Sequence, residues 1–307
     1  MFSDQNLLLL AVSGGVAFSV IGWAYRSASA RSIPTCFVAV GMGLMGVGWF
    51  GWRSFHQPDA PGLSAPALVW VWGIVNGVAQ GYCVYLFRVG LRYGPFAPLW
   101  CAGNLVFVTP AIFSLCFLGE RLNRLQALAM ITAALCVVTA SMGRKVGDES
   151  PLATRAISRV IYPAMLSAMI ILTGLCGAGL KHLSSVVLNG SPLNPRFNDC
   201  FMLAMYGALL AWVLAEAFWH GTHRVSYRWA ILFAVVAGSG SVTGMTLTGM
   251  VSRLAGGIGF AVIAVASVLS GSLITSFGFG ERRTWTWWAT VVLAMLAVLL
   301  FQIASTE

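Results

Sequence analysis

Ten separate stretches of apolar residues, each long enough to cross a lipid bilayer, constrain the fold of this chain more than any other feature. A membrane-spanning helix needs about 20 predominantly apolar residues. Inside a bilayer only helices and closed barrels satisfy every backbone hydrogen bond, and stretches of this length favour helices. We therefore expect an all-α integral membrane protein with ten transmembrane helices, at residues 6–26, 33–52, 67–87, 96–118, 123–142, 160–180, 198–219, 227–251, 257–279 and 284–303.

The composition excludes an ordinary soluble domain. Hydrophobic residues make up 58% of the 307 residues and charged residues only 9%, whereas soluble domains are about 25% charged. The net charge is +9, but the basic residues lie singly or in pairs at the ends of the apolar stretches. Such residues anchor and orient helices, so we expect a lipid bilayer as partner and no nucleic acid.

The seven cysteines all lie inside apolar stretches, and no two of them form a C-x-x-C motif. They are interpreted as small buried apolar residues, and neither a disulfide framework nor a metal site is expected. We likewise expect no cofactor and no catalytic residues.

The chain contains an internal repeat. Gly119-Glu120-Arg121 closes one apolar stretch and precedes the next, and Gly280-Glu281-Arg282 does the same in the later part of the chain. The repeat predicts two five-helix halves, 1–142 and 160–307, joined by a charged connector at 143–159. Because five is odd, the second half must enter the membrane in the opposite orientation, which predicts an inverted 5+5 repeat of the kind found in transporters.

The orientation follows from the distribution of lysine and arginine. The connections on the side of the 143–159 connector carry 12 basic residues, and the connections on the other side carry 6. The positive-inside rule then places both termini outside.

The Gly119-Glu120-Arg121-Leu122 segment and the apolar helix behind it resemble the signature of the drug/metabolite transporter superfamily, EamA type. Phe279-Gly280-Glu281-Arg282 resembles the same signature, although Arg283 and Trp285 replace aliphatic positions of the pattern. The segment from Leu91 through Pro110 to Glu120 is similar to the preceding part of the repeat. The resemblance covers nearly the whole chain, as two five-helix repeats. It implies export or exchange of small metabolites, often amino acids. It also implies cytoplasmic termini, opposite to the charge count, so the orientation stays open.

The repeated motif has a structural and a functional interpretation. Gly119 and Gly280 are suited to end a helix in the left-handed conformation. Glu120 and Glu281 then lie near the N-terminus of the next helix, where the helix dipole favours a negative charge. The functional alternative is an ion-pair gate at the membrane surface between the glutamate and a nearby arginine.

Glu216 is the acidic residue that we expect below the membrane surface. An ionisable residue inside the membrane is a functional candidate by default, and proton coupling is the role considered for Glu216. His220 and His223 follow at helical spacing, which raises a metal site as an alternative. Their place at a helix end beside Trp219 favours interfacial residues instead.

Polar residues in the middle of apolar helices are the candidate substrate site. Facing lipid, their hydrogen-bonding groups would go unsatisfied at several kcal/mol each, so they must face protein or a water-filled path. Interhelical hydrogen bonding without any substrate is the alternative for each of them. The candidates are Trp72, Asn76, Gln80, Trp100, Asn104, Ser239, Thr243 and Ser267.

Pro110 and Gly271 occupy equivalent positions in the two halves, since the offset that aligns Gly119 with Gly280 also aligns this pair. Proline and glycine both weaken the backbone hydrogen-bond ladder of a helix and permit kinks. The pair is interpreted as hinges of two bending gates, with static kinks as the alternative.

Together these features predict a transporter of a small neutral or zwitterionic metabolite, amino-acid-like by the family resemblance, in the plasma (inner) membrane. Transport by alternating access around a midplane cavity is the expected mechanism. Export of amine or quaternary cations remains an alternative, because tryptophan faces bind such cations. A membrane enzyme and a non-transporting receptor or assembly subunit are the rivals from other classes. A monomer suffices to enclose a cavity, and a homodimer stays open.

Overall fold

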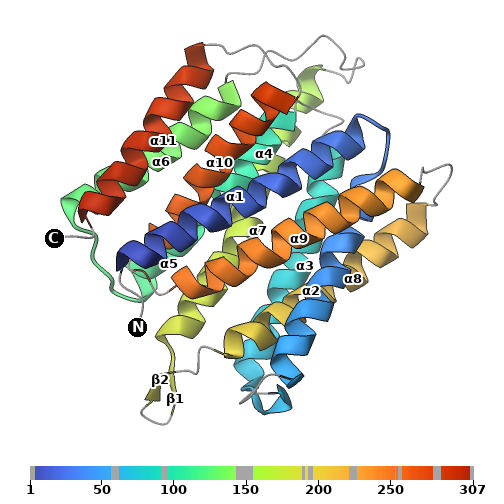
Figure 1. Ribbon diagram of the computed structural model, residues 1–307, viewed down its shortest axis with the longest axis horizontal. Helices are drawn as coiled ribbons and strands as arrows, with labels where there is room; N and C mark the ends of the chain where they lie inside the picture. Colours follow the sequence, from blue (N-terminus) through green and yellow to red (C-terminus); the bar gives the residue numbers. More distant parts are fainter. Residues whose placement is uncertain are drawn as a thin grey trace.

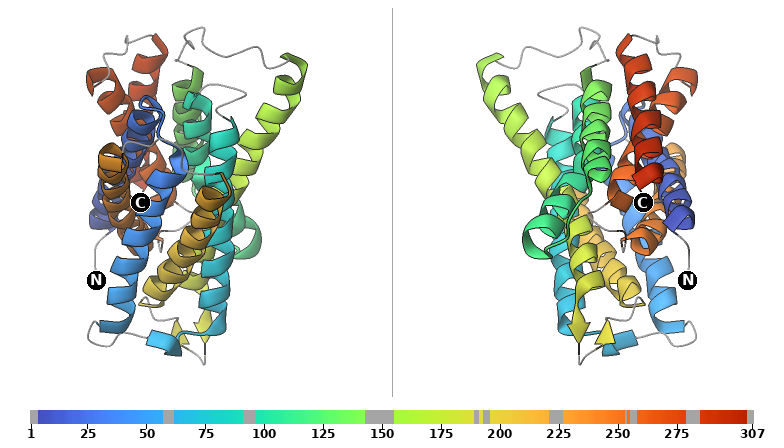
Figure 2. Two further views of the ribbon diagram at one scale, coloured as in Figure 1. Left: turned by 90° about the vertical axis from the view of Figure 1, so that its right-hand side faces the viewer. Right: turned by 90° about the vertical axis from the view of Figure 1, so that its left-hand side faces the viewer.

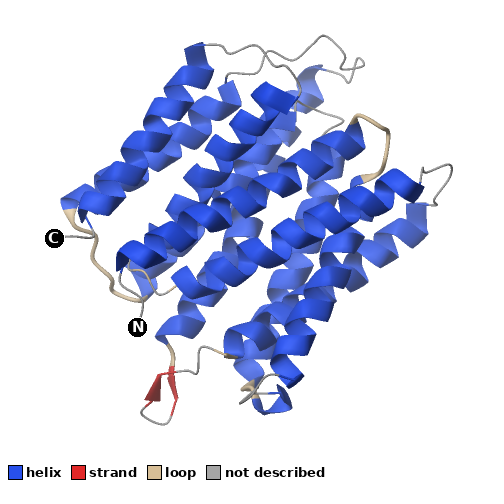
Figure 3. Ribbon diagram, viewed as in Figure 1, coloured by secondary structure: helices blue, strands red, loops and turns tan. Residues whose placement is uncertain are grey.

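The structure of the chain is a computed structural model that describes residues 4–56, 62–90, 96–142, 155–188, 191–192, 196–220, 227–252, 254, 258–278 and 285–304. Most of these residues are helical, and two antiparallel strands of two residues each are the strands among them (Figures 1 and 3). The elements are α1 (Asp4–Ser29), α2 (Thr35–His56), η1 (Gly62–Ser64), α3 (Ala67–Gly90), α4 (Phe96–Asn104), η2 (Leu105–Phe107), α5 (Val108–Phe117), α6 (Arg124–Met142), α7 (Arg155–Ser185), β1 (Val187–Leu188), β2 (Ser191–Pro192), α8 (Phe197–His220), α9 (Tyr227–Val251), α10 (Ile258–Gly278) and α11 (Trp285–Ala304).

Within the described part of the chain, 9 helical segments are long and apolar enough to cross a membrane. They lie at nine of the ten positions expected from the sequence. The remaining position, 123–142, forms α6, whose apolar part Arg124–Ala140 is shorter than the others. The chain is therefore built as a multi-pass integral membrane protein.

The fourth predicted span is not one continuous helix. It consists of α4 and α5, with the 3₁₀ turn η2 between them, and α5 contains Pro110 as its third residue. Proline has no N–H to donate to the carbonyl four residues earlier, and its ring crowds that carbonyl. The tighter turn at Leu105–Phe107 lies where this bond is missing.

The sixth span begins earlier than expected. We predicted a connector that continues to residue 159, but α7 already begins at Arg155 and continues to Ser185. Pro163 lies inside this helix. Both views of Figure 2 show the N-terminal part of α7 leaning away from the other helices.

The helix boundaries repeat with the offset seen in the sequence. Shifting α3, the α4–α5 segment and α6 by the offset that carries Gly119 onto Gly280 reproduces the bounds of α9, α10 and α11 to within one residue. The first two helices of each half, α1 and α2 against α7 and α8, correspond less closely in length.

The helices of the two halves interleave. α1 packs against α9 and α10, α2 packs against α8 and α9, and α3 packs against α8 and α7. α6 and α11 lie side by side at one end of the bundle (Figure 1). Most of the core therefore lies between the halves, and neither half encloses a core of its own.

Glycines permit the closest helix contacts. A Cβ added at Gly73 would lie 2.6 Å from the Ala204 Cβ, and one added at Gly81 would lie 2.5 Å from Cγ of Trp212. Small residues let backbones approach in this way where no hydrophobic force drives helices together in lipid. Because residue numbers rise together along this contact, α3 and α8 run in the same direction.

Candidate substrate cavity

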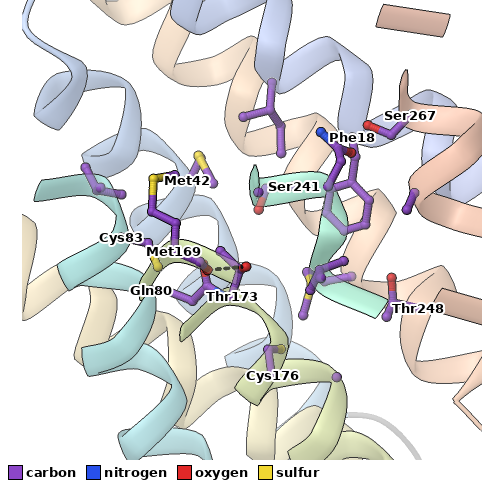
Figure 4. Close-up of a pocket in the computed structure, with 18 of the residues that line it drawn as sticks. Phe18, Met42, Gln80, Cys83, Met169, Thr173, Cys176, Ser241, Thr248 and Ser267 are labelled. Carbon is purple, nitrogen blue, oxygen red and sulfur yellow. Dashed lines mark hydrogen bonds between the residues drawn. The ribbon is translucent and has the colours of Figure 1, made fainter. Parts of the chain in front are cut away.

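A cavity of about 240 Å³ lies in the middle of the bundle (Figure 4). Its wall is built from α1, α2, α3, α4 and η2 of the first half and from α7, α8, α9 and α10 of the second. α6 and α11 supply none of the described lining residues. Small-molecule sites typically lie between helices of a bundle and measure roughly 300–1,000 Å³, so this cavity suits a small ligand.

Most of the wall is apolar, and part of it consists of flexible, polarisable side chains. Four methionines contribute to it, namely Met42 of α2, Met169 of α7, Met205 of α8 and Met245 of α9. Sulfur atoms also contact one another and a phenol: the Cys176 thiol lies 3.5 Å from the Met205 Sδ, and the Tyr25 hydroxyl lies 3.7 Å from Sδ of Met42. Thioethers are polarisable and flexible, so such a wall adapts to the shape of a bound molecule.

Several polar groups on the wall are already hydrogen-bonded inside the protein. The Tyr206 and Ser241 hydroxyls lie 2.6 Å apart. Thr248 and Thr173 donate to the carbonyls of Gly244 and Met169 on their own helices, at 2.7 Å and 2.6 Å. These groups keep acceptor capacity, but each hydroxyl hydrogen of the two threonines is committed to the backbone.

Two polar side chains on the wall have no hydrogen-bond partner among the described residues. Ser267 of α10 is 1% exposed, and its Oγ is unpartnered. Gln80 of α3 lines the cavity on the side of α3 and α7 (Figure 4). A buried hydroxyl without a partner costs about 1–3 kcal/mol, so Ser267 is poised to bind a ligand or water. The Gln80 amide is half-buried and can bind the same groups from its side of the wall.

Half of the candidate substrate residues line this cavity. Gln80, Trp100, Asn104 and Ser267 are on its wall. The Asn104 side chain also donates from Nδ2 to the Trp100 carbonyl at 2.8 Å, which holds it against its own helix. These four come from three helices and both halves of the chain.

The other four candidates lie elsewhere. Asn76 is fully buried and donates to the Trp72 carbonyl at 2.8 Å, and both residues pack against Gly179 of α7, outside the cavity. Ser239 and Thr243 are exposed on the outer face of α9. Residues two apart on a helix point about 200° away from each other, so Ser241, between them in sequence, is the one that reaches the cavity.

Glu216, the coupling candidate, is buried at the end of α8. Its carboxylate lies 3.1 Å from Nε of Arg88 at the end of α3, and its side chain is 6% exposed. Its charge is therefore compensated within the protein. His223 and the side chain of His220 lie outside the described residues.

Gly119 ends α5 as predicted, in the left-handed region with φ +66°. Glu120 does not cap the next helix, however. The N-cap of α6 is Asn123, which exchanges hydrogen bonds with Gln126 at 2.7 Å and 3.0 Å. This reciprocal pair is a capping box.

The Glu120 carboxylate instead forms an ion pair with Lys181 of α7, at 2.8 Å. The Lys181 side chain is 3% exposed and also donates to the Leu254 carbonyl at 2.9 Å. The ammonium group thus ties the end of α5 to α7 and to the segment between α9 and α10. Gly280 and Glu281, the second copy of the motif, lie outside the described residues.

The backbone differs at Pro110 and Gly271, the two hinge candidates. Pro110 follows the 3₁₀ turn η2, but α10 runs as one helix through Gly271. Gly271 lies beside the Trp100 indole: a Cβ added at Gly271 would be 3.8 Å from Nε1 of Trp100.

Sequence reasoning missed most of the apolar wall. Phe18, Tyr25 and the four methionines line the cavity, but nothing in a uniformly apolar helix separates such residues from lipid-facing ones. Ser241 was detectable, because the offset of the repeat aligns it with Gln80 and so gives it the equivalent position in the second half.

No family model matches the chain, and no curated protein matches it. Solved structures do match. One of them, described only as the crystal structure of a protein, has a TM-score of 0.75 at 13% sequence identity, over 98% of each chain. At this identity the similarity establishes the helical fold alone.

Proposed function

We propose that the chain is a transmembrane transporter that carries a small neutral or zwitterionic metabolite through this cavity by alternating access. The observation that supports it best is the cavity itself, which is central and is lined by helices of both halves. A site shared between two halves can open to either side when the halves rock against each other. The EamA-type resemblance, with amino-acid-like substrates and the plasma membrane as location, enters this proposal as a prediction.

An inverted repeat is part of the proposal. α3 and α9 have equivalent bounds in the two halves, and their directions differ. Gly43 and Gly51 of α2 lie against Leu210 and Leu203 of α8, so α2 is antiparallel to α8. Gly41 of α2 lies against Ala234 of α9, and Gly238 of α9 lies against Met45 of α2. Residue numbers rise together along this contact, so α2 is parallel to α9. Since α3 is parallel to α8, α3 and α9 run in opposite directions, as an inverted repeat requires.

Ion pairs lie beyond the two ends of the cavity and supply candidate closures. Arg88 follows Phe87, the last lining residue of α3, and pairs with Glu216. Lys181 lies one helical turn beyond Gly177, the last lining residue of α7. Because Gly179 packs near the start of α3, against Trp72, Lys181 is at the end opposite to Arg88.

The test uses cysteines that the chain already has. Cys83 and Cys176 line the cavity, whereas Cys136 is buried between α6 and α11. Variants that retain one cysteine each are placed in oriented membrane vesicles and treated with a membrane-impermeant methanethiosulfonate from one side at a time. Alternating access predicts that Cys83 and Cys176 react from both sides and that Cys136 reacts from neither.

Reaction of the cavity cysteines from one side only, in every condition, would exclude alternating access. It would favour a receptor or assembly subunit instead. This measurement needs no knowledge of the substrate.

A further inference from the structure

The described wall of the cavity carries no carboxylate, ammonium, guanidinium or imidazole group. None of its described lining residues is Asp, Glu, Lys, Arg or His. Arg88 and Lys181, which lie on lining helices beyond the cavity, are already paired with Glu216 and Glu120. Moving an ion from water into an apolar site without a counter-charge is strongly unfavourable. The wall therefore favours a ligand without charge over a zwitterion or an ion.

The wall also presents a fixed aromatic surface. The Trp100 indole packs against Gly22 of α1, where an added Cβ would lie 2.6 Å from its Cζ2, and beside Gly271 of α10. At Gly22 only a glycine leaves room for the ring. Phe18, Tyr25 and Phe260 add further rings, and methionine sulfur contacts aromatic rings favourably. Rings and thioethers together favour a flat aromatic ligand.

Two unpartnered polar groups interrupt this apolar wall, the buried Ser267 hydroxyl and the Gln80 amide. They lie on different helices, α10 and α3, and Figure 4 places them on separate parts of the wall. The free hydrogen-bonding capacity of Ser267 does not stabilise the packing, because an unsatisfied buried polar group is destabilising. A ligand with a hydroxyl or carbonyl group would satisfy it.

We infer that the transported molecule is a small neutral aromatic compound whose hydrogen-bonding group is bound by Ser267 or Gln80 and whose ring lies against Trp100 and the methionines. This inference rests on the proposed function and narrows it. Of the neutral or zwitterionic metabolites proposed above, it favours neutral molecules and disfavours amino-acid-like zwitterions.

The experiment compares four probes that share one phenyl ring and differ in charge. They are 2-phenylethanol, phenylalanine, 2-phenylethylamine and phenylacetate, which are neutral, zwitterionic, cationic and anionic at pH 7. Binding is measured by isothermal titration calorimetry on the full chain in lipid nanodiscs, with protein-free nanodiscs as the blank for lipid partitioning. We expect 2-phenylethanol to bind at least about 100-fold more tightly than each charged probe, because burial of an uncompensated charge is so costly.

Variants then locate the binding site. Ser267→Ala removes a hydroxyl that has no partner among the residues that the structure describes, so we expect folding to be preserved. It should weaken 2-phenylethanol about 5-fold, the value of one hydrogen bond, and Gln80→Leu should weaken it comparably. Ser239→Ala is the matched control, since this serine is exposed on the outer face of α9 and should leave binding unchanged.

Three results would overturn the inference. In the first, phenylalanine or 2-phenylethylamine binds as tightly as 2-phenylethanol, and Ser267→Ala or Gln80→Leu weakens that binding. This result would refute a neutral ligand but leave the proposed transport function standing. Binding of no probe above the blank would refute the aromatic class. Binding that neither variant weakens would refute the assigned polar contacts. The proposed transport function is tested separately: reaction of Cys83 and Cys176 from one side of the membrane only would refute it.

Discussion

Lys181 is the least exposed of the charged residues in the described part of the chain. It is almost fully buried, yet it forms an ion pair with Glu120 and a hydrogen bond with the Leu254 carbonyl. Glu120 is different, because 26% of its side chain is exposed and water can solvate it. Burial thus makes the lysine depend on the glutamate more than the reverse.

This asymmetry predicts unequal effects of breaking the pair. Glu120→Gln leaves a buried cation with one carbonyl as partner and should lower the free energy of unfolding by about 3 kcal/mol. Lys181→Met keeps the shape and leaves a carboxylate that water reaches, so it should cost about 1 kcal/mol. Unfolding of the detergent-purified variants, followed by circular dichroism, measures both values.

The double variant Glu120→Gln with Lys181→Met should recover much of the stability lost in Glu120→Gln, since no buried charge then remains. Arg121→Gln, at the exposed neighbouring position, is the control and should change nothing measurable. A larger loss in Lys181→Met than in Glu120→Gln would contradict this account of the pair.

At the scale of elements, glycine contacts determine how closely the helices approach. α3 lies on α8 through Gly73, whose added Cβ would lie 2.6 Å from the Phe201 carbonyl oxygen as well as from Ala204. A backbone carbonyl cannot move aside as a flexible side chain can. By contrast, an added Cβ at Gly207 of α8 meets nothing within 4 Å.

We therefore expect opposite effects of alanine at these two glycines. Gly73→Ala should force α3 away from α8 and lower the free energy of unfolding by about 1–3 kcal/mol, the usual cost of overpacking. Gly207→Ala should be neutral or stabilising by up to about 1 kcal/mol, because alanine is the better helix former. Thermal midpoints in one detergent compare the two, and equal destabilisation would show that close packing at Gly73 is not the cause.

At the scale of the whole molecule, the two halves depend on each other. Their helices interleave, with α1, α2 and α3 each packed on helices of the second half. The halves 1–142 and 160–307 are accordingly repeats in one structure, and the interfaces between them hold most of the buried core. Exposed apolar side chains such as Phe117, Phe218 and Trp285 lie outside this core, where a bilayer would cover them.

Cutting the chain between the halves tests this dependence. With a protease site inserted at Gly147, in the connector, the two fragments should stay together through affinity purification in mild detergent. Each half expressed alone should fail to give a monodisperse protein, because its share of the interface is exposed. A half that purifies alone with native helix content would contradict the interleaved core.

Sequence alone predicted the features that depend on the bilayer and on local backbone chemistry. Apolar length determines where helices cross a membrane, so nine spans agree with the structure. Gly119 was predictable as a helix end, since the left-handed conformation costs glycine little. Polar residues in apolar helices tend to avoid lipid, and Gln80, Trp100, Asn104 and Ser267 lie on the cavity wall.

Only the tertiary structure decided which face of each helix turns inward. An apolar helix in lipid carries no strong polar–apolar pattern, so Ser239 and Thr243 could not be separated from Ser241. The same limit hid the methionines of the wall. The pairing of Glu120 with Lys181 depends on contact between α7 and the end of α5, distant in sequence, which no local rule encodes. Helix location thus follows from transfer into lipid, whereas the cavity follows from how the helices pack against one another.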